Sequence, residues 1–189
     1  MYLTLKCRLQ FFKFTSSILN LTDYLCHNLI TNMKIEKYQT TNESDGLKYF
    51  FDSIGKETIE KVVVYQHLSM QSLIERGLPP QMQVYNLAFG DRIAGTDDFS
   101  DQIASNNGDM EMVLSTVADT TFYFWEGYPQ ANLFLTGSSV SRTYLYQKKI
   151  ERYWDEINEV AYVAGRLNSQ FELFKKGKTY DAFLIIRKR

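Results

Sequence analysis

The feature that most constrains the fold is a helix–strand–helix succession in the second half of the chain. Apolar residues recur at spacings of three and four between Gly108 and Glu126, which predicts a helix with one face against a core. Residues 127–129 end this helix, the apolar run 132–136 predicts a short buried strand, and residues 140–159 predict a second helix. A buried strand between two helices needs further strands beside it, so we expect helices packed on a sheet.

Short β-branched and aromatic runs predict the remaining strands. Before the first long helix they lie at residues 35–40, 47–53, 59–67 and 84–89, with a short helix at 70–76. After the second helix, residues 162–166 run into 170–174, and a hairpin turn at 175–178 leads to a last strand at 180–187. Residues 91–107 predict a surface loop. The order predicts an α+β fold with a mostly antiparallel sheet, two main helices and at least one strand–helix–strand crossover.

The first 32 residues differ from the rest, and we treat residues 33–189 as one α+β domain. Lys6, Arg8 and Lys13 interrupt the apolar extension, whereas a membrane span needs about 18 uninterrupted apolar residues. No small-residue cleavage site of a secretory signal follows. The extension is therefore a dispensable segment, a docked helix or a targeting segment. We expect a cytoplasmic protein with no membrane partner.

The distribution of cysteine and histidine excludes several classes of chemistry from residues 33–189. Cys7, Cys26 and His27 all lie in the extension, so His67 is the domain's single histidine and the domain has no cysteine. A disulfide framework, a thiolate nucleophile and a Cys/His metal site are therefore not expected there. His67 ends a β-branched run, where a hydrogen-bonded structural role is more common than a place in a catalytic triad.

Charge divides the domain into an acidic and a basic part. Residues 33–136 hold 7 Lys and Arg against 15 Asp and Glu, whereas residues 137–189 hold 11 against 6, giving net charges of −8 and +5. One interpretation is a solvated surface. The other is an anionic small molecule or nucleic acid at the basic part, contacted by Arg166, residues 175–178 and residues 187–189.

The turn that joins the buried strand to the second helix is the leading candidate site for ligand binding. Its candidate residues are Gly137, Ser138, Ser139, Ser141, Arg142 and Thr143. A serine there caps the helix, and the first-turn N–H groups attract anions. A cation at this end opposes the helix dipole by roughly 0.3–1 kcal/mol. Arg142 therefore pairs with an acidic residue, points to solvent, or holds a phosphate or carboxylate.

Three secondary candidates have simpler structural explanations. Asn107 or Asp109 caps the first helix, where an acidic residue suits the helix dipole without any function. Tyr146 offers a stacking surface for a nucleotide, but aromatic residues at helical spacing are more often part of a core.

Several motifs resemble an uncharacterised bacterial family of small α+β proteins, of the domain of unknown function 6934 type. The motifs are residues 85–91, 105–109, 114–117, 137–147 and 180–184. The resemblance covers about residues 33–189 and implies no established activity. A weaker similarity is to the GNAT acyltransferase architecture, in its strand–helix–strand–helix order and in Leu145 and Tyr146 of the second helix. The chain departs from that family at residues 106–109, which have one glycine where a Gly-rich pyrophosphate loop is typical.

Three functions remain open, and the cofactor is unknown. The first is a binding protein for an anionic ligand at residues 137–143. The second is a GNAT-like acyltransferase or other nucleotide-dependent enzyme, with acid–base groups drawn from Asp91, Asp97, Asp98, Asp109 or Tyr146. The third is a protein-interaction or toxin-type partner.

Overall fold

The computed structural model describes residues 36–96, 98–101 and 106–188. The chain divides into two compact units, residues 1–34 and 35–189, and the fold below is that of the second. Its helices are α2 (Met70–Glu75), α3 (Met110–Gly127), α4 (Val140–Arg152) and α5 (Trp154–Val160). The first 32 residues, which the sequence sets apart as an extension, lie outside the described residues.

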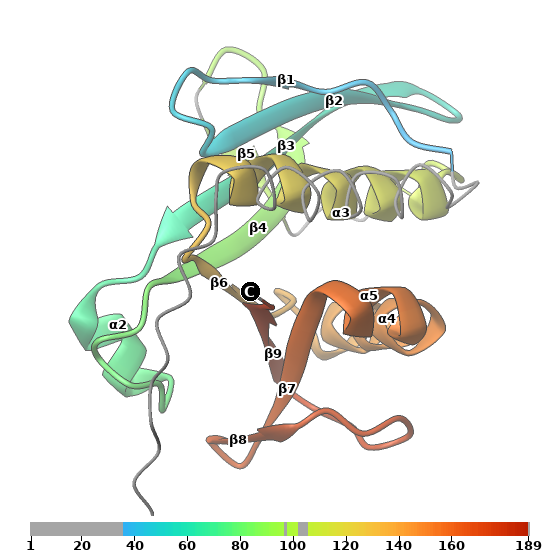
Figure 1. The fold of residues 1–189 in the computed structure, drawn as a ribbon. Helices are drawn as coiled ribbons and strands as arrows, with labels where there is room; N and C mark the ends of the chain where they lie inside the picture. Colours follow the sequence, from blue (N-terminus) through green and yellow to red (C-terminus); the bar gives the residue numbers. More distant parts are fainter. Residues whose placement is uncertain (1–35, 97, 102–105, 189) are drawn as a thin grey trace, which may run out of the picture. The chain divides into compact units, whose positions relative to one another are not determined.

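A nine-stranded sheet forms the centre of this unit (Figure 1). Its strands are β1 (Thr41–Asn42), β2 (Lys48–Ile54), β3 (Thr58–His67), β4 (Val84–Arg92), β5 (Phe99–Ser100), β6 (Asn132–Leu135), β7 (Ala161–Leu167), β8 (Gln170–Leu173) and β9 (Ala182–Arg187). The strand order is β1-β2-β3-β4-β6-β9-β7-β8, and β5 pairs with β4. Among the described strands only β4 and β6 pair in parallel, and α3 connects them. The predicted α+β class, mostly antiparallel sheet and crossover are confirmed.

Neighbouring residues of the central strands face opposite sides of the sheet, as the pleat requires. On β6, Leu133 belongs to the core beneath α3, whereas Phe134 belongs to a second core with Leu73 of α2. On β9, Phe183 packs with Ile150 of α4. Helices α3, α4 and α5 therefore cover one face of the sheet and α2 covers the other.

The buried face of α3 is rotated relative to the apolar stripe of its sequence. Val113, Val117 and Phe124 are buried as predicted, but Met110 is exposed, and Thr116 and Thr120 take the most buried positions. Both threonine hydroxyls donate to carbonyls of the preceding turn, at 2.8 Å. Because their hydroxyls are satisfied within the helix, these residues can pack in the core.

The expected first strand at 35–40 is wrong for residues 36–40, which form no strand. The Tyr38 N–H donates to Thr116 Oγ1 at 2.9 Å, and Lys37 pairs with Asp119. The segment therefore makes its polar contacts with α3 and not with a neighbouring strand. Only Thr41 and Asn42 then pair with β2. Ile35 lies outside the described residues.

Four other element predictions need correction. The expected helix at 140–159 is two helices, because Tyr153 leaves helical geometry at φ −103° and ψ 28°. The segment 162–174 is a hairpin of β7 and β8, with Asn168 and Ser169 both at positive φ, as a tight two-residue turn requires. Because β9 pairs with β7, the turn at 175–178 does not join neighbouring strands. The expected loop 91–107 contains the end of β4 and the short β5.

Candidate functional site

The predicted turn residues 137–143 lie together at the junction of β6 and α4. β6 runs parallel to β4 in the register Val84 to Asn132 and Asn86 to Phe134. β6 then ends at Leu135, while β4 continues to Arg92. The chain thus enters α4 at the point where the two parallel strands part.

Gly137, Ser139 and Thr143 build the start of α4. The Gly137 N–H donates to Thr143 Oγ1 at 2.9 Å, and Thr143 is only 5% exposed. A Cβ at Gly137 would lie 2.5 Å from the Thr143 nitrogen, so no larger residue fits without a backbone shift. Ser139 is the N-cap and accepts the Arg142 N–H at 3.3 Å. These three residues therefore have structural roles.

Ser138, Ser141 and Arg142 make up the rest of the turn. Ser138 and Ser141 are exposed, and the Arg142 guanidinium donates to Ser138 Oγ at 3.4 Å. Helix geometry gives the N–H groups of Val140 and Ser141 no acceptor inside α4, and no acceptor for them occurs among the described residues. The first turn of α4 contains no carboxylate. The junction thus combines open donors with a positive charge.

Tyr146, one turn further along α4, faces the same region. Its ring lies 5.8 Å from that of Phe89 near the end of β4. Burial raises the pKa of Tyr146, and the positive charge of Arg142 opposes this while the negative charge of Asp101 adds to it. Ser138 Oγ also donates to the Asp101 carbonyl at 3.0 Å. The structure therefore brings Tyr146 and Arg142 together from separate turns of α4.

The secondary candidates Asn107 and Asp109 lie at the start of α3 and have structural partners. Asp109 Oδ2 accepts the Ser53 hydroxyl at 2.6 Å and the Tyr38 hydroxyl at 2.7 Å. Burial raises the pKa of Asp109, but the bonds from Ser53 and Tyr38, a backbone hydrogen bond and the charge of Lys61 together hold the pKa below its ordinary value. The Asn107 side chain accepts the Glu57 N–H and donates to Ser53 Oγ, both at 2.9 Å. Both residues thus fasten the β2–β3 hairpin to α3.

A buried ion pair beside this cluster was missed by sequence reasoning. Lys61 of β3 contacts Asp91 of β4, and the two residues are only 6% and 9% exposed. They are paired in register on adjacent strands, and the charge of Lys61 also helps to lower the pKa of Asp109. The signal was available, because Lys61 alternates with the apolar Val63 and Tyr65 and so shares their buried face. Of the other carboxylates considered, Asp98 is the residue directly before β5. Asp97 lies outside the described residues.

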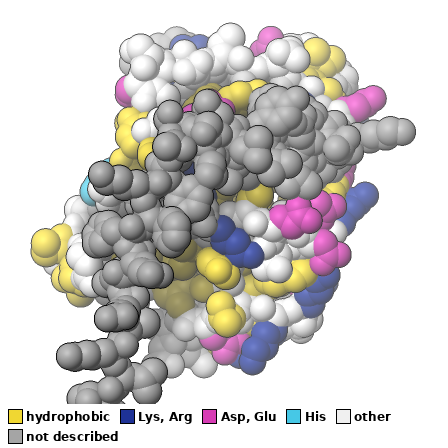
Figure 2. All heavy atoms as spheres, in the orientation of Figure 1, with side chains coloured by type: hydrophobic (Ala, Val, Ile, Leu, Met, Phe, Trp, Pro, Cys, Tyr) yellow, Lys and Arg dark blue, Asp and Glu magenta, His cyan; other side chains and the backbone are white. Residues whose placement is uncertain are grey.

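Many cations of the basic C-terminal part already have partners within the protein. Arg166 pairs with Asp181 at 2.6 Å, and Lys178 pairs with Glu172 at 2.5 Å. On the face shown in Figure 2, basic side chains around α4 and α5 are interspersed with acidic ones. Arg187 donates to the Trp125 carbonyl, and Arg189 lies outside the described residues. The net positive charge of this part is therefore not gathered into one patch on that face.

His67 ends β3, and its ring makes an edge contact with Tyr85 at 5.1 Å.

Within residues 36–96, 98–101 and 106–188, side chains of His, Cys, Asp and Glu form no group of three or more that could hold a metal ion. A membrane crossing would need a longer or more apolar helix than any that the described residues form.

Comparison with known proteins gives one match. No curated protein and no solved structure matches the sequence. A family model described as "Family of unknown function (DUF6934)" matches residues 34–188, which is most of the chain and confirms the predicted resemblance. The chain therefore belongs to the DUF6934 family.

Proposed function

We propose that residues 137–143 bind the phosphate group of a small anionic ligand. The observation that carries the proposal is the first turn of α4, which has two open N–H groups, the cation of Arg142 and no carboxylate. Backbone N–H groups at a helix N-terminus point at a bound anion, and the helix dipole favours negative charge there. The positive charge of Arg142 adds to the attraction of a phosphate at this position.

The position of the turn in the sheet supports the same proposal. In open sheets with parallel strands, ligands bind outside the carboxyl ends of those strands, where the connections diverge. The turn follows the carboxyl end of β6, the partner of β4 in the parallel pair. Tyr146 and Phe89 add aromatic surface beside it, which suits a ligand with a flat group such as a nucleotide base.

The test is calorimetric titration of the full-length chain with inorganic phosphate, pyrophosphate and nucleotides. We expect Arg142→Ala to weaken phosphate binding at least tenfold while changing the melting temperature by no more than about 2 °C, because Arg142 belongs to none of the buried core clusters. Arg152→Ala is the matched control, since Arg152 lies in the same helix and pairs with Glu111 at the opposite end. Equal binding by wild type and Arg142→Ala, or no binding to the wild type, would reject the proposal.

A nucleic-acid partner is the macromolecular form of this proposal. It would add phosphate contacts from the basic C-terminal part, and its affinity would fall steeply with salt. The intramolecular pairs of Arg166 and Lys178 favour the small ligand, because those cations would have to exchange partners. Titration with single- and double-stranded oligonucleotides at 50 and 200 mM salt separates the two forms.

Acyl transfer is the second candidate function, and the succession β4, α3, β6 and α4 supports it. The GNAT architecture, to which we expect a weaker similarity from the sequence, binds the coenzyme A pyrophosphate at the start of the helix corresponding to α3. In this chain the carboxylate of Asp109 occupies that position, and its lowered pKa keeps it ionised near neutral pH. Coenzyme A would therefore have to place its phosphates at α4 instead. A thermal shift with coenzyme A that Arg142→Ala removes would support this function, and no shift would count against it.

A further inference from the structure

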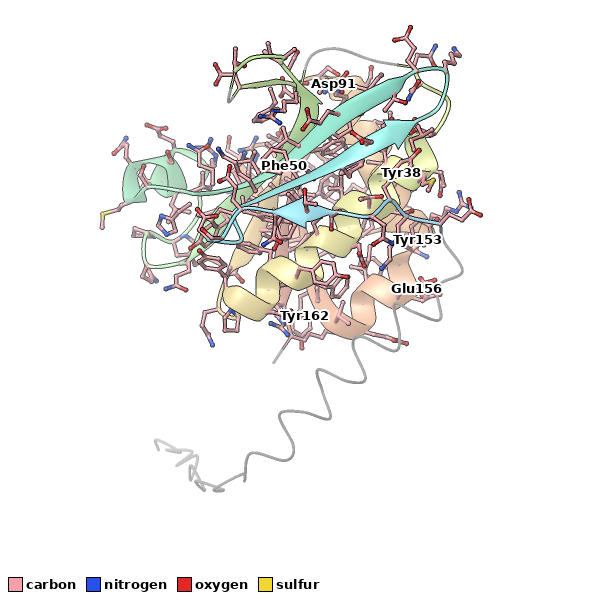
Figure 3. All side chains as sticks on the ribbon, turned by 90° about the horizontal axis from the view of Figure 1, so that it is seen from above. Tyr38, Phe50, Asp91, Tyr153, Glu156 and Tyr162 are labelled. Atoms are coloured by element: carbon pink, nitrogen blue, oxygen red, sulfur yellow. The ribbon has the colours of Figure 1, made fainter. Side chains whose placement is uncertain are left out.

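A pocket on the other side of α3 has a chemistry unlike that of the α4 turn. It has a volume of about 510 Å³ and lies between residues 37–46, β2 and the second half of α3. Figure 3 looks down on this layer, where the segment leading into β1 runs above α3. Bonds from Lys37 to Asp119 and from Tyr38 to Thr116 hold that segment on the helix and so form one wall of the pocket.

The lining of the pocket combines tyrosine side chains with uncompensated carboxylates. Tyr49, Tyr123 and Tyr128 line it, together with Asp45 and Glu126. Lys37 also lines the pocket, but Asp119 neutralises it at 2.5 Å. Among the described residues neither Asp45 nor Glu126 forms an ion pair, so the lining has a net negative charge.

The Tyr49 hydroxyl adds an unpartnered polar group to this lining. Tyr49 is only 4% exposed, and its hydroxyl has no hydrogen-bond partner among the described residues. The hydroxyl oxygen itself is accessible, because every fully buried polar side-chain atom of the described residues has a partner. Burial raises the pKa of Tyr49 to about 12, and the charge of Glu126 is the next cause, followed by Tyr128 and Asp45. A Cβ on Gly46, which also lines the pocket, would lie 3.8 Å from the Tyr49 hydroxyl, so the hydroxyl lies at the wall of the pocket.

Besides neutral polar side chains such as Gln39 and Ser44, the pocket is lined by carboxylates and tyrosine rings. A phenol with a raised pKa stays protonated near neutral pH and keeps free lone pairs for an N–H donor. Carboxylates accept charge-assisted hydrogen bonds, and tyrosine rings attract cations at their faces. An aliphatic ammonium group satisfies all three kinds of group, whereas an anion meets the charges of Asp45 and Glu126. A quaternary ammonium has no N–H to donate to the Tyr49 hydroxyl.

We propose that this pocket binds an aliphatic ammonium group, which donates to the Tyr49 hydroxyl and is neutralised by Asp45 and Glu126. The ammonium group belongs either to a free amine or to a lysine side chain of a peptide. This site is separate from the α4 turn and takes a ligand of opposite charge, so the two proposals succeed or fail independently.

The test is calorimetric titration of the full-length chain with 1,5-diaminopentane and with a lysine blocked at its backbone amino and carboxyl groups. Binding of both compounds supports the ammonium group, and a preference between them distinguishes a free amine from a lysine side chain. The uncharged 1,5-pentanediol and tetramethylammonium are the ligand controls. Binding of either control as tight as that of the amine would overturn the proposal.

Two variants locate the binding. Tyr49→Phe removes only the hydroxyl, and we expect at least fivefold weaker amine binding with no loss of melting temperature, because that hydroxyl makes no hydrogen bond within the described protein. Glu126→Gln should weaken binding about tenfold, whereas Asp155→Asn, an exposed carboxylate of α5, should leave it unchanged. No detectable amine binding, or equal loss in Glu126→Gln and Asp155→Asn, would overturn the proposal. Arg142→Ala should bind the amine as wild type does.

Discussion

Helices α3 and α4 begin with opposite charges, although both follow a strand of the same parallel pair. The start of α3 has the carboxylates of Asp109 and Glu111, and Asp109 is bonded to Ser53 and Tyr38. The start of α4 has Arg142, a serine cap and no carboxylate. An anion at a helix start is favourable by itself, whereas a cation there needs a compensating partner. The carboxylates at the start of α3 would repel an anionic ligand, whereas the start of α4 combines a cation with the N–H groups of Val140 and Ser141, which have no acceptor among the described residues.

The acidic start of α3 and the basic end of α4 also contact each other. Glu111 in the first turn of α3 accepts the Tyr153 hydroxyl at 2.6 Å, and it pairs with Lys149 and Arg152 from the last turn of α4. Basic residues suit a helix C-terminus and acidic residues suit an N-terminus. Lys149 and Arg152 at the end of α4 thus pair within the protein. Arg142 is the basic residue in the first turn of the same helix.

The largest effect on this comparison is expected from Asp109→Ala. It would leave the Ser53 hydroxyl without its acceptor and the Tyr38 hydroxyl with only the Ile54 carbonyl, at 3.1 Å, and hydrogen bonds to a charged group contribute about 1.5–3 kcal/mol each. We expect the free energy of unfolding to fall by about 2–3 kcal/mol in urea denaturation. Asp155→Ala, in the exposed first turn of α5, is the control and should cost less than about 1 kcal/mol. Equal losses in both variants would show that Asp109 acts only through the helix dipole.

A smaller effect, about 1–2 kcal/mol near neutral pH, is expected from Asp109→Asn, and it should depend on pH. The pKa of Asp109 in the folded state lies below its ordinary value of 3.8. Its ionised form therefore stabilises the fold above about pH 4, and this contribution disappears as pH falls through the folded pKa. The unfolding free energies of wild type and Asp109→Asn should converge between pH 5 and pH 2.5. Curves that stay parallel over this range would contradict the assignment.

The smallest effect is expected at the cap of α4. Ser139→Ala removes the acceptor of the Arg142 N–H and should cost about 1 kcal/mol, while Ser141→Ala, which is exposed, should change stability by less than about 0.5 kcal/mol. Chemical denaturation of the two variants side by side checks this. If Ser141→Ala costs as much as Ser139→Ala, the cap has been assigned to the wrong serine.

The elements of the fold were largely predictable, and their pairing was not. The apolar spacing of α3 and the run at β6 identified a crossover, because helices and buried strands have local signatures. The failed strand at 36–40 depends on Thr116, which lies 78 residues from Tyr38 in the chain. The assumed hairpin at 175–178 failed because β9 pairs with β7, a choice made across the sheet. Neither contact has a local signal.

The two candidate sites differ in the same respect, because only one of them could be recognised from the sequence. The α4 turn is a continuous stretch, so its glycine, serines and arginine were recognisable from residue type and position. The ammonium pocket joins Asp45 and Tyr49 to Tyr123, Glu126 and Tyr128, and only folding brings these residues together.

The sequence by itself determined the α+β class, the crossover, the charge asymmetry and the absence of cysteine from residues 33–189. These properties depend on composition and on periodicities of a few residues. The tertiary structure decided which charges are already satisfied. Asp109 meets Ser53 and Lys61 meets Asp91 across 56 and 30 residues of chain, so their partners become known only when the strands pair.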